Sequence, residues 1–226
     1  MDAFLKTPIS HRGLHDNKNI IENTLESFDA SINKNFATEC DIILSKDEEV
    51  MVFHDFNLKR LTEINMLVNE CNASDLRKIK LLKTNSVISS LDEMLYRVNS
   101  QIPILIEIKE SFHPKIEERL LEVIRTYRGE IAIQSFDFKA VKWFKQHAPF
   151  YKIGLVSRDK NLKVQEIIKL GVDFLSFDIN HIEENVVKEA KKEGFPVLAW
   201  TVDTKDKYNR SLQFADNIIF EKINIT

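Results

Sequence analysis

Residues 102–146 read IPILIEIKESFHPKIEERLLEVIRTYRGEIAIQSFDFKAVKWFKQ, a stretch in which strand patterns and helical patterns alternate. Ile102–Ile108 and Glu130–Ser135 are short runs rich in β-branched residues, which favour strands. Pro114–Thr126 and Lys139–Gln146 carry apolar residues at helical spacing, and proline suits the first turn of a helix. A strand, a helix and another strand in this order indicate a parallel sheet with crossover helices.

The same alternation runs along the rest of the chain. We expect strands at Thr7–His11, Phe36–Leu44, Ile102–Ile108, Glu130–Ser135, Tyr151–Val156, Val172–Phe177, Pro196–Thr201 and Asn217–Phe220. We expect helices at Thr24–Asn33, Ser90–Val98, Pro114–Thr126, Lys139–Gln146, Leu162–Lys169, Glu183–Glu193 and Lys205–Leu212. Eight such units favour an α/β fold closed as a (β/α)₈ TIM barrel over an open sheet. The 226 residues suit one barrel domain spanning 1–226.

One further strand pattern, Val50–Asp55, does not fit the count of eight. Ser45–Glu49 is too short for a parallel crossover, so this run must form an antiparallel hairpin with the preceding strand. A turn centred near residues 47 and 48 would place position 41 opposite position 54, so that Asp41 and His54 lie side by side.

Residues 56–87 form the least regular part of the chain, with one short helical stretch around Ala73–Ile79. Loops that follow strands build the mouth of a barrel, so this segment is interpreted as an excursion over the mouth. A plain surface loop is the alternative.

The composition narrows the function classes. A net charge of −3 and a pI near 6.1 leave no basic excess for binding nucleic acid. Two cysteines, Cys40 and Cys71, are too few for a disulfide scaffold. No signal-peptide pattern and no apolar run of membrane-spanning length occur, so we expect a cytoplasmic protein.

Charged residues interrupt the expected strands near their carboxyl ends, where the active sites of such barrels lie. Glu39 and Asp41 share one face of their strand because side chains alternate, and Glu107 and Lys109 share a face of theirs. Carboxylate ligands alone suit Mg²⁺, Ca²⁺ or Mn²⁺ better than zinc. Two structural alternatives remain. Glu39 and Asp41 could be solvated acids on an outer edge strand, and Glu107 and Lys109 could form a salt bridge with each other.

Other polar and aromatic residues fall at the same strand ends. His11 and His54 can transfer protons near neutral pH, and Arg12 can donate two hydrogen bonds to phosphate oxygens. Phe136 and Trp200 can form the wall of a substrate pocket, or simply pack.

This combination resembles the glycerophosphodiester phosphodiesterase family over nearly the whole chain. The resemblance rests on His11-Arg12-Gly13, Glu22-Asn23-Thr24, Glu39-x-Asp41, Ser45-Lys46-Asp47 before Val50–Asp55, Glu107-x-Lys109, Ser135-Phe136 and Trp200-Thr201-Val202. It implies one divalent cation, Mg²⁺ or Ca²⁺ with Mn²⁺ as a further candidate, on residues like Glu39, Asp41 and Glu107. It also implies acid–base catalysis by residues like His11 and His54, and phosphate contacts from residues like Arg12 and Lys109. The implied reaction converts a small glycerophosphodiester to sn-glycerol 3-phosphate and an alcohol.

The chain departs from the family pattern at three places. Ile21 stands where a proline is usual, and Glu48 and Glu49 follow Lys-Asp where a glycine is usual. Phe220-Glu221 replaces Thr-Asp at the closing strand, which puts substrate contacts there in question.

Two other functions stay open at this stage. A lysophospholipase D-like activity would use the apolar residues of the 56–87 segment, and a non-catalytic barrel would only bind a phosphodiester. The sequence also leaves open the alcohol of the substrate, the preferred cation, the acid and base assignment, the attacking group and the oligomeric state.

Overall fold

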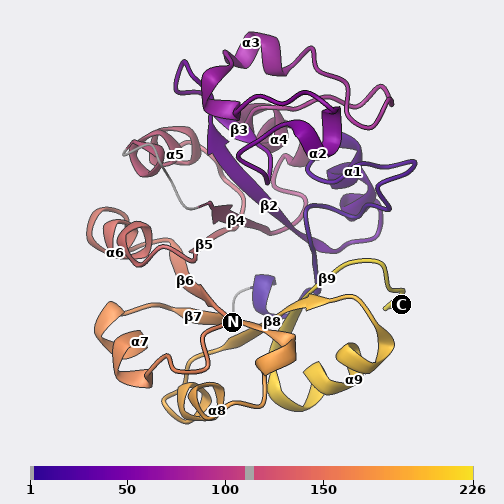
Figure 1. Ribbon diagram of the computed structural model, residues 1–226. Coiled ribbons are helices and arrows are strands. Elements are labelled where there is room, and N and C mark those ends of the chain that lie inside the picture. Colours follow the sequence, from indigo (N-terminus) through magenta and orange to yellow (C-terminus); the bar gives the residue numbers. More distant parts are fainter. Residues whose placement is uncertain (1–2, 110–114, 226) are drawn as a thin grey trace.

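The structure, a computed structural model, describes residues 3–109 and 115–225. Within these residues eight parallel strands close into a barrel surrounded by helices (Figure 1). They are β1 (Ile9–Ser10), β2 (Ala37–Leu44), β4 (Ile104–Ile108), β5 (Ile131–Ser135), β6 (Lys152–Ser157), β7 (Phe174–Asp178), β8 (Val197–Val202) and β9 (Asn217–Phe220). The sheet is closed because β1 pairs in parallel with both β2 and β9. The predicted (β/α)₈ barrel is therefore confirmed.

The helices form the outer ring where the sequence predicts them. They are α1 (Leu25–Asn33), α4 (Leu91–Val98), α5 (Ile116–Ile124), α6 (Phe138–His147), α7 (Val164–Leu170), α8 (Asn185–Lys192) and α9 (Lys205–Phe214). Ser90 caps α4 by accepting a hydrogen bond from the backbone N–H of Glu93, as its residue type favours. The predicted helix start at Pro114 lies outside the described residues.

The barrel interior is filled in layers. At the end of the barrel where the strands begin, a 3₁₀ turn, η1 (Ala3–Leu5), places Phe4 against Phe174 and Leu198. Higher up, the strand register puts Asp41 of β2 level with Glu107 of β4. The interior thus changes from apolar to charged toward the carboxyl ends of the strands.

The hairpin is present, but the predicted register is wrong by one residue. β3 (Val50–Val52) pairs antiparallel with β2, with Leu44 opposite Val50, and the backbone N–H of Phe53 donates to the carbonyl of Asp41. Residue 53, not 54, is therefore opposite residue 41. The reason lies in the turn, where the N–H of Ser45 bonds the carbonyl of Glu49 and centres the loop on residue 47.

Residues 56–87 pack mainly against this hairpin. The segment contains α2 (Lys59–Thr62), η2 (Val68–Glu70) and α3 (Ala73–Leu76), so the predicted helix at Ala73–Ile79 is shorter than expected. Figure 1 shows α2 and α3 beside β3, on one flank of the barrel. A small core joins this segment to the hairpin, formed by Ile43, Met51, Phe53, Leu58, Leu61, Val68, Leu76 and Leu81. The start of the segment reaches the barrel mouth.

The two cysteines, Cys40 and Cys71, are both buried and are not joined by a disulfide bond. Of the helices in the described ranges, none has the length and apolar character needed to cross a bilayer.

Candidate active site

Three carboxylates meet inside the upper end of the barrel. Glu39 and Asp41 project inward from alternate positions of β2, and Glu107 joins them from β4. All three are buried, and one ligand atom from each lies within 4.8 Å of the others. The structure therefore brings together the three residues predicted as metal ligands.

The carboxylate cluster has the electrostatics of a cation site. Burial, together with the nearby charges of Asp41 and Glu107, raises the pKa of Glu39 well above its usual range. Burial acts on Asp41 in the same direction, but Arg12 and Lys109 outweigh it and lower the pKa of Asp41 to about 2. Glu39 Oε2 accepts the backbone N–H of Arg12 at 2.8 Å, whereas buried Oε1 has no hydrogen-bond partner among the described residues. A hard divalent cation would satisfy that oxygen, so the donor set fits such an ion.

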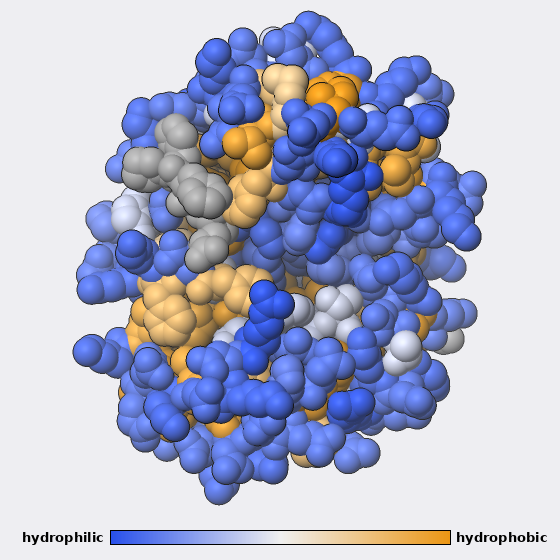
Figure 2. Space-filling view, viewed as in Figure 1, coloured by the Kyte–Doolittle hydropathy of each residue, from blue (hydrophilic) through white to orange (hydrophobic). Residues whose placement is uncertain are grey.

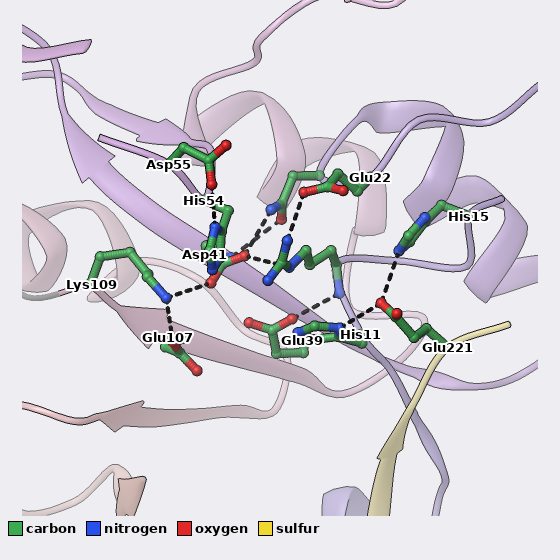
Figure 3. Close-up of polar contacts among 12 residues, drawn as sticks. His11, His15, Glu22, Glu39, Asp41, His54, Asp55, Glu107, Lys109 and Glu221 are labelled. Atoms are coloured by element: carbon green, nitrogen blue, oxygen red, sulfur yellow. Dashed lines mark hydrogen bonds and ion pairs between the residues drawn. The ribbon is translucent and has the colours of Figure 1, made fainter. Parts of the chain in front are cut away.

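Two cationic side chains flank the cluster. Lys109 Nζ lies 2.8 Å from Glu107 Oε1 and 3.5 Å from Asp41 Oδ1 (Figure 3). On the other side, Arg12 Nε lies 3.3 Å from Asp41 Oδ2. The salt bridge considered for Glu107 and Lys109 thus exists, but both residues also line an open cavity.

Arg12 is placed by a sharp turn at the end of β1. Its φ is +56° and that of Gly13 is +76°, a region that glycine adopts most readily. A Cβ at position 13 would also collide with Ser27 of α1. The glycine noted in the sequence therefore serves both the turn and the close approach of α1.

The two histidines predicted to transfer protons each have a carboxylate on Nδ1. His11 Nδ1 lies 2.9 Å from Glu221 Oε2, and His54 Nδ1 lies 2.5 Å from Asp55 Oδ1 (Figure 3). The hydrogen bond with His11 is the main reason why the pKa of Glu221 falls to about 2. A carboxylate on Nδ1 favours the proton on that atom and leaves Nε2 for chemistry. Both imidazoles line the same cavity, so two oriented proton-transfer groups face one space.

A chain of ion pairs connects His54 to the arginine on the other side of the site. Arg60 donates to both oxygens of Glu22, at 2.9 and 2.7 Å, and its Nε lies 2.5 Å from Asp55 Oδ2. Glu22 Oε1 also accepts from Arg12 Nη1 at 2.8 Å. Burial by itself would raise the pKa of Glu22. The hydrogen bonds and charges of the two arginines outweigh it, so the pKa of Glu22 lies well below its usual range. The start of the 56–87 segment is thereby tied to the centre of the site.

The far wall of the cavity is aromatic. Phe136 after β5 and Trp200 of β8 pack edge to face, with ring centroids 5.4 Å apart. The cavity has a volume of about 1250 Å³. Figure 2 shows it as a hollow with hydrophobic side chains gathered over β6 and a mostly hydrophilic wall opposite. Such a cavity can hold a small organic phosphate between a charged wall and an apolar wall.

The structure brings all nine predicted site residues into one region. His11, Arg12, Asp41, His54, Glu107, Lys109, Phe136 and Trp200 line the cavity, and Glu39 lies buried in the carboxylate cluster. Sequence reasoning assigned no role to Glu22, Asp55, Arg60 or Glu221. Glu22 and Asp55 belong to the quoted motifs, and Glu221 was noted as a departure at a strand end. Arg60 offered no such signal.

Comparison with known proteins points to one group. Residues 11–222 match the sequence model of the glycerophosphoryl diester phosphodiesterase family. A glycerophosphodiester phosphodiesterase of Caldanaerobacter subterraneus subsp. tengcongensis is 28% identical over 221 residues, covering 91% of the chain and 89% of that protein. Lysophospholipase D GDPD1 of Rattus norvegicus is 31% identical over 140 residues, covering 56% of the chain and 43% of that protein.

A solved structure has the same fold. It is a phosphodiesterase from Oleispira antarctica in complex with the product sn-glycerol-3-phosphate. It superposes with a TM-score of 0.87 at 20% identity, covering 98% of the chain and 95% of that protein.

Proposed function

Because the chain belongs to the glycerophosphoryl diester phosphodiesterase family, we propose that it hydrolyses glycerophosphodiesters to sn-glycerol 3-phosphate and an alcohol with the help of a divalent cation. One observation carries the proposal: the buried carboxylate cluster and two carboxylate-bound histidines meet at a single cavity. In the proposed enzyme, residues 1–226 form one catalytic domain, with 56–87 as an insertion at the mouth. The cytoplasmic location stays a prediction.

The proposed ligands of the cation are Glu39, Asp41 and Glu107. Their oxygen-only chemistry suits Mg²⁺ or Ca²⁺, with Mn²⁺ as a further candidate. When bound, such a cation supplies Lewis-acid polarisation of a phosphoryl oxygen. The unpartnered Oε1 of Glu39 supports this assignment.

The proposed work of the other residues follows from their positions. Arg12 and Lys109 bind the phosphate and offset the negative charge that grows in the transition state. One imidazole removes the proton of the attacking hydroxyl, and the other protonates the leaving alkoxide. Glu221 and Asp55 hold the two rings by Nδ1, so that Nε2 carries the proton transfers.

Two attacking groups fit this arrangement. The 2-hydroxyl of the glycerol half can attack and form a cyclic phosphate, which water then opens, or water can attack directly. A 2-deoxy substrate separates the two routes. It reacts normally when water attacks and not at all when the 2-hydroxyl does.

The test of the proposed function is release of sn-glycerol 3-phosphate from glycerophosphocholine by the purified protein. His11→Ala and His54→Ala should each lower the rate by on the order of 10²–10⁴. His147→Ala, a histidine on the outer helix α6, should leave it unchanged. Excess EDTA should abolish turnover, and Mg²⁺, Ca²⁺ or Mn²⁺ should restore it. Full turnover by both active-site variants would refute the assignment of the histidines.

A lysophospholipase D-like activity is the second candidate. The 56–87 segment exposes four large apolar side chains, Ile64, Met66, Leu67 and Leu82, each about 40% exposed. Such a surface could accept an acyl chain. Turnover of lysophosphatidylcholine well above that of glycerophosphocholine would favour this candidate over the first.

A further inference from the structure

The cavity has two cationic side chains that lack an acidic partner among the described residues. Its lining contains five cationic and three anionic side chains among the described residues: Arg12, Lys59, Arg60, Lys109 and Arg158 against Asp41, Asp55 and Glu107. Arg12, Arg60 and Lys109 are paired with these carboxylates or with Glu22. Lys59 and Arg158 have no carboxylate within ion-pair distance in the described part of the chain. Two positive charges therefore remain available to a ligand.

Arg158 occupies a specific place on the aromatic wall. It directly follows β6, and its guanidinium carbon lies 5.8 Å from the centroid of the Phe136 ring. Phe136 in turn packs against Trp200. A quaternary ammonium group would bind to the face of the Phe136 ring, but the guanidinium of Arg158 already covers that face. The donors of Arg158 remain free for an anion.

Lys59 adds positive charge from another side. It begins α2, which follows the β2–β3 hairpin, whereas β6 is separated from β2 by β4 and β5 in the sheet. Figure 2 shows the hollow between the side formed by α2 and the side formed by β6. The two unpaired cations thus flank the catalytic groups, and their combined field favours ligands with more negative charge than a single phosphodiester.

We propose, on the basis of the proposed function, that the alcohol half of the substrate carries an acidic group, a carboxylate or a second phosphate, and that Arg158 binds it. Arg158 is then a residue that determines specificity for the alcohol. Alcohols that carry only a positive charge, such as choline and ethanolamine, are disfavoured because they face two uncompensated cations.

A matched pair of substrates tests this proposal. Glycerophosphoserine and glycerophosphoethanolamine differ by one carboxylate, so their kcat/KM ratio measures the contribution of that group. Because Arg158 is exposed to solvent, we expect a preference for the serine diester of only about two- to fivefold at low ionic strength. The preference should decrease with added salt, which screens exposed charges. A diester whose alcohol bears a phosphate forms a second arm, and it should be preferred likewise.

Variants locate the effect. Arg158→Ala should reduce the serine-to-ethanolamine ratio to about one, mainly by raising KM for the serine diester, and Arg158→Lys should keep part of the preference. Arg125→Ala, which removes the same charge at the exposed end of α5, should leave the ratio unchanged.

The results separate this inference from the proposed function. Hydrolysis without any preference for the acidic alcohols, or a preference that Arg158→Ala leaves intact, overturns the inference alone. Failure to hydrolyse any of these diesters with any of the three cations overturns the proposed function, and the inference with it.

Discussion

The link made by Arg60 gives the sharpest single test of the site. Arg60→Leu removes two hydrogen bonds to Glu22 and one to Asp55 while keeping a side chain of moderate size. Glu22 is 2% exposed and keeps its contacts to Arg12 and Asn17. Asp55 keeps His54 but loses the group that holds its second oxygen.

The size of the effect follows from burial. Breaking a fully buried ion pair costs about 3–5 kcal/mol of unfolding free energy. The Arg60 side chain is 43% exposed, so water replaces part of the loss. We expect a cost of about 1–3 kcal/mol, which lowers Tm by roughly 3–10 °C for a chain of this size. Because His54 then loses part of its support, kcat should fall by on the order of 10–10².

The pH dependence has a defined sign. The folded-state pKa of Glu22 lies below its ordinary value of 4.5, so its stabilising contribution is complete above pH 4.5 and is lost as pH falls toward the folded-state value. The difference in Tm between the native protein and Arg60→Leu should therefore be full at pH 7 and smaller at pH 3.

Thermal unfolding followed by circular dichroism, together with steady-state kinetics, provides the measurement. Lys78→Leu is the control, since it removes a surface ion pair from the same segment and should change stability by less than about 0.5 kcal/mol. Arg60→Lys should fall between, because an ammonium cannot reproduce the forked contact with Glu22. If Arg60→Leu matches the native protein in both Tm and kcat, the ion pairs of Arg60 with Glu22 and Asp55 neither stabilise the fold nor help to position His54.

Three further predictions follow from the same structure. Glu221→Gln keeps an acceptor for His11 but removes its charge, so kcat should fall by on the order of 10², and a native rate would exclude Glu221 from the proton-transfer set. Glu39→Gln should weaken binding of Mg²⁺, Ca²⁺ or Mn²⁺ in calorimetry at least about tenfold, because one of three carboxylate charges is lost; unaltered affinity would argue against this cluster as the cation site. Phe4→Ala should lower the unfolding free energy by about 3–5 kcal/mol in denaturant titrations, since the ring fills the lower barrel against Phe174; a loss below 1 kcal/mol would contradict that packing.

Local patterns in the sequence were enough for the architecture and for most of the candidate site. The alternation of strand and helix patterns predicts the barrel, since each unit buries its own apolar face in a regular way. Side-chain alternation on one strand places Glu39 and Asp41 on the same face without any knowledge of the fold. Because all strands of a parallel barrel end on one rim, the residues at those ends could be grouped before their distances were known.

The tertiary structure decided which charged groups meet as partners. The hairpin register differs from the prediction by one residue, because the hydrogen bonds of Ser45, and not the length of the turn, determine its centre. Glu221 lies 210 residues from His11 in the sequence and reaches it because β9 closes the barrel against β1. Arg60 reaches Glu22 because a small apolar core holds the 56–87 segment against the hairpin. Sequence periodicity describes the neighbours of a residue along one element, whereas barrel closure and loop packing select its neighbours from distant parts of the chain.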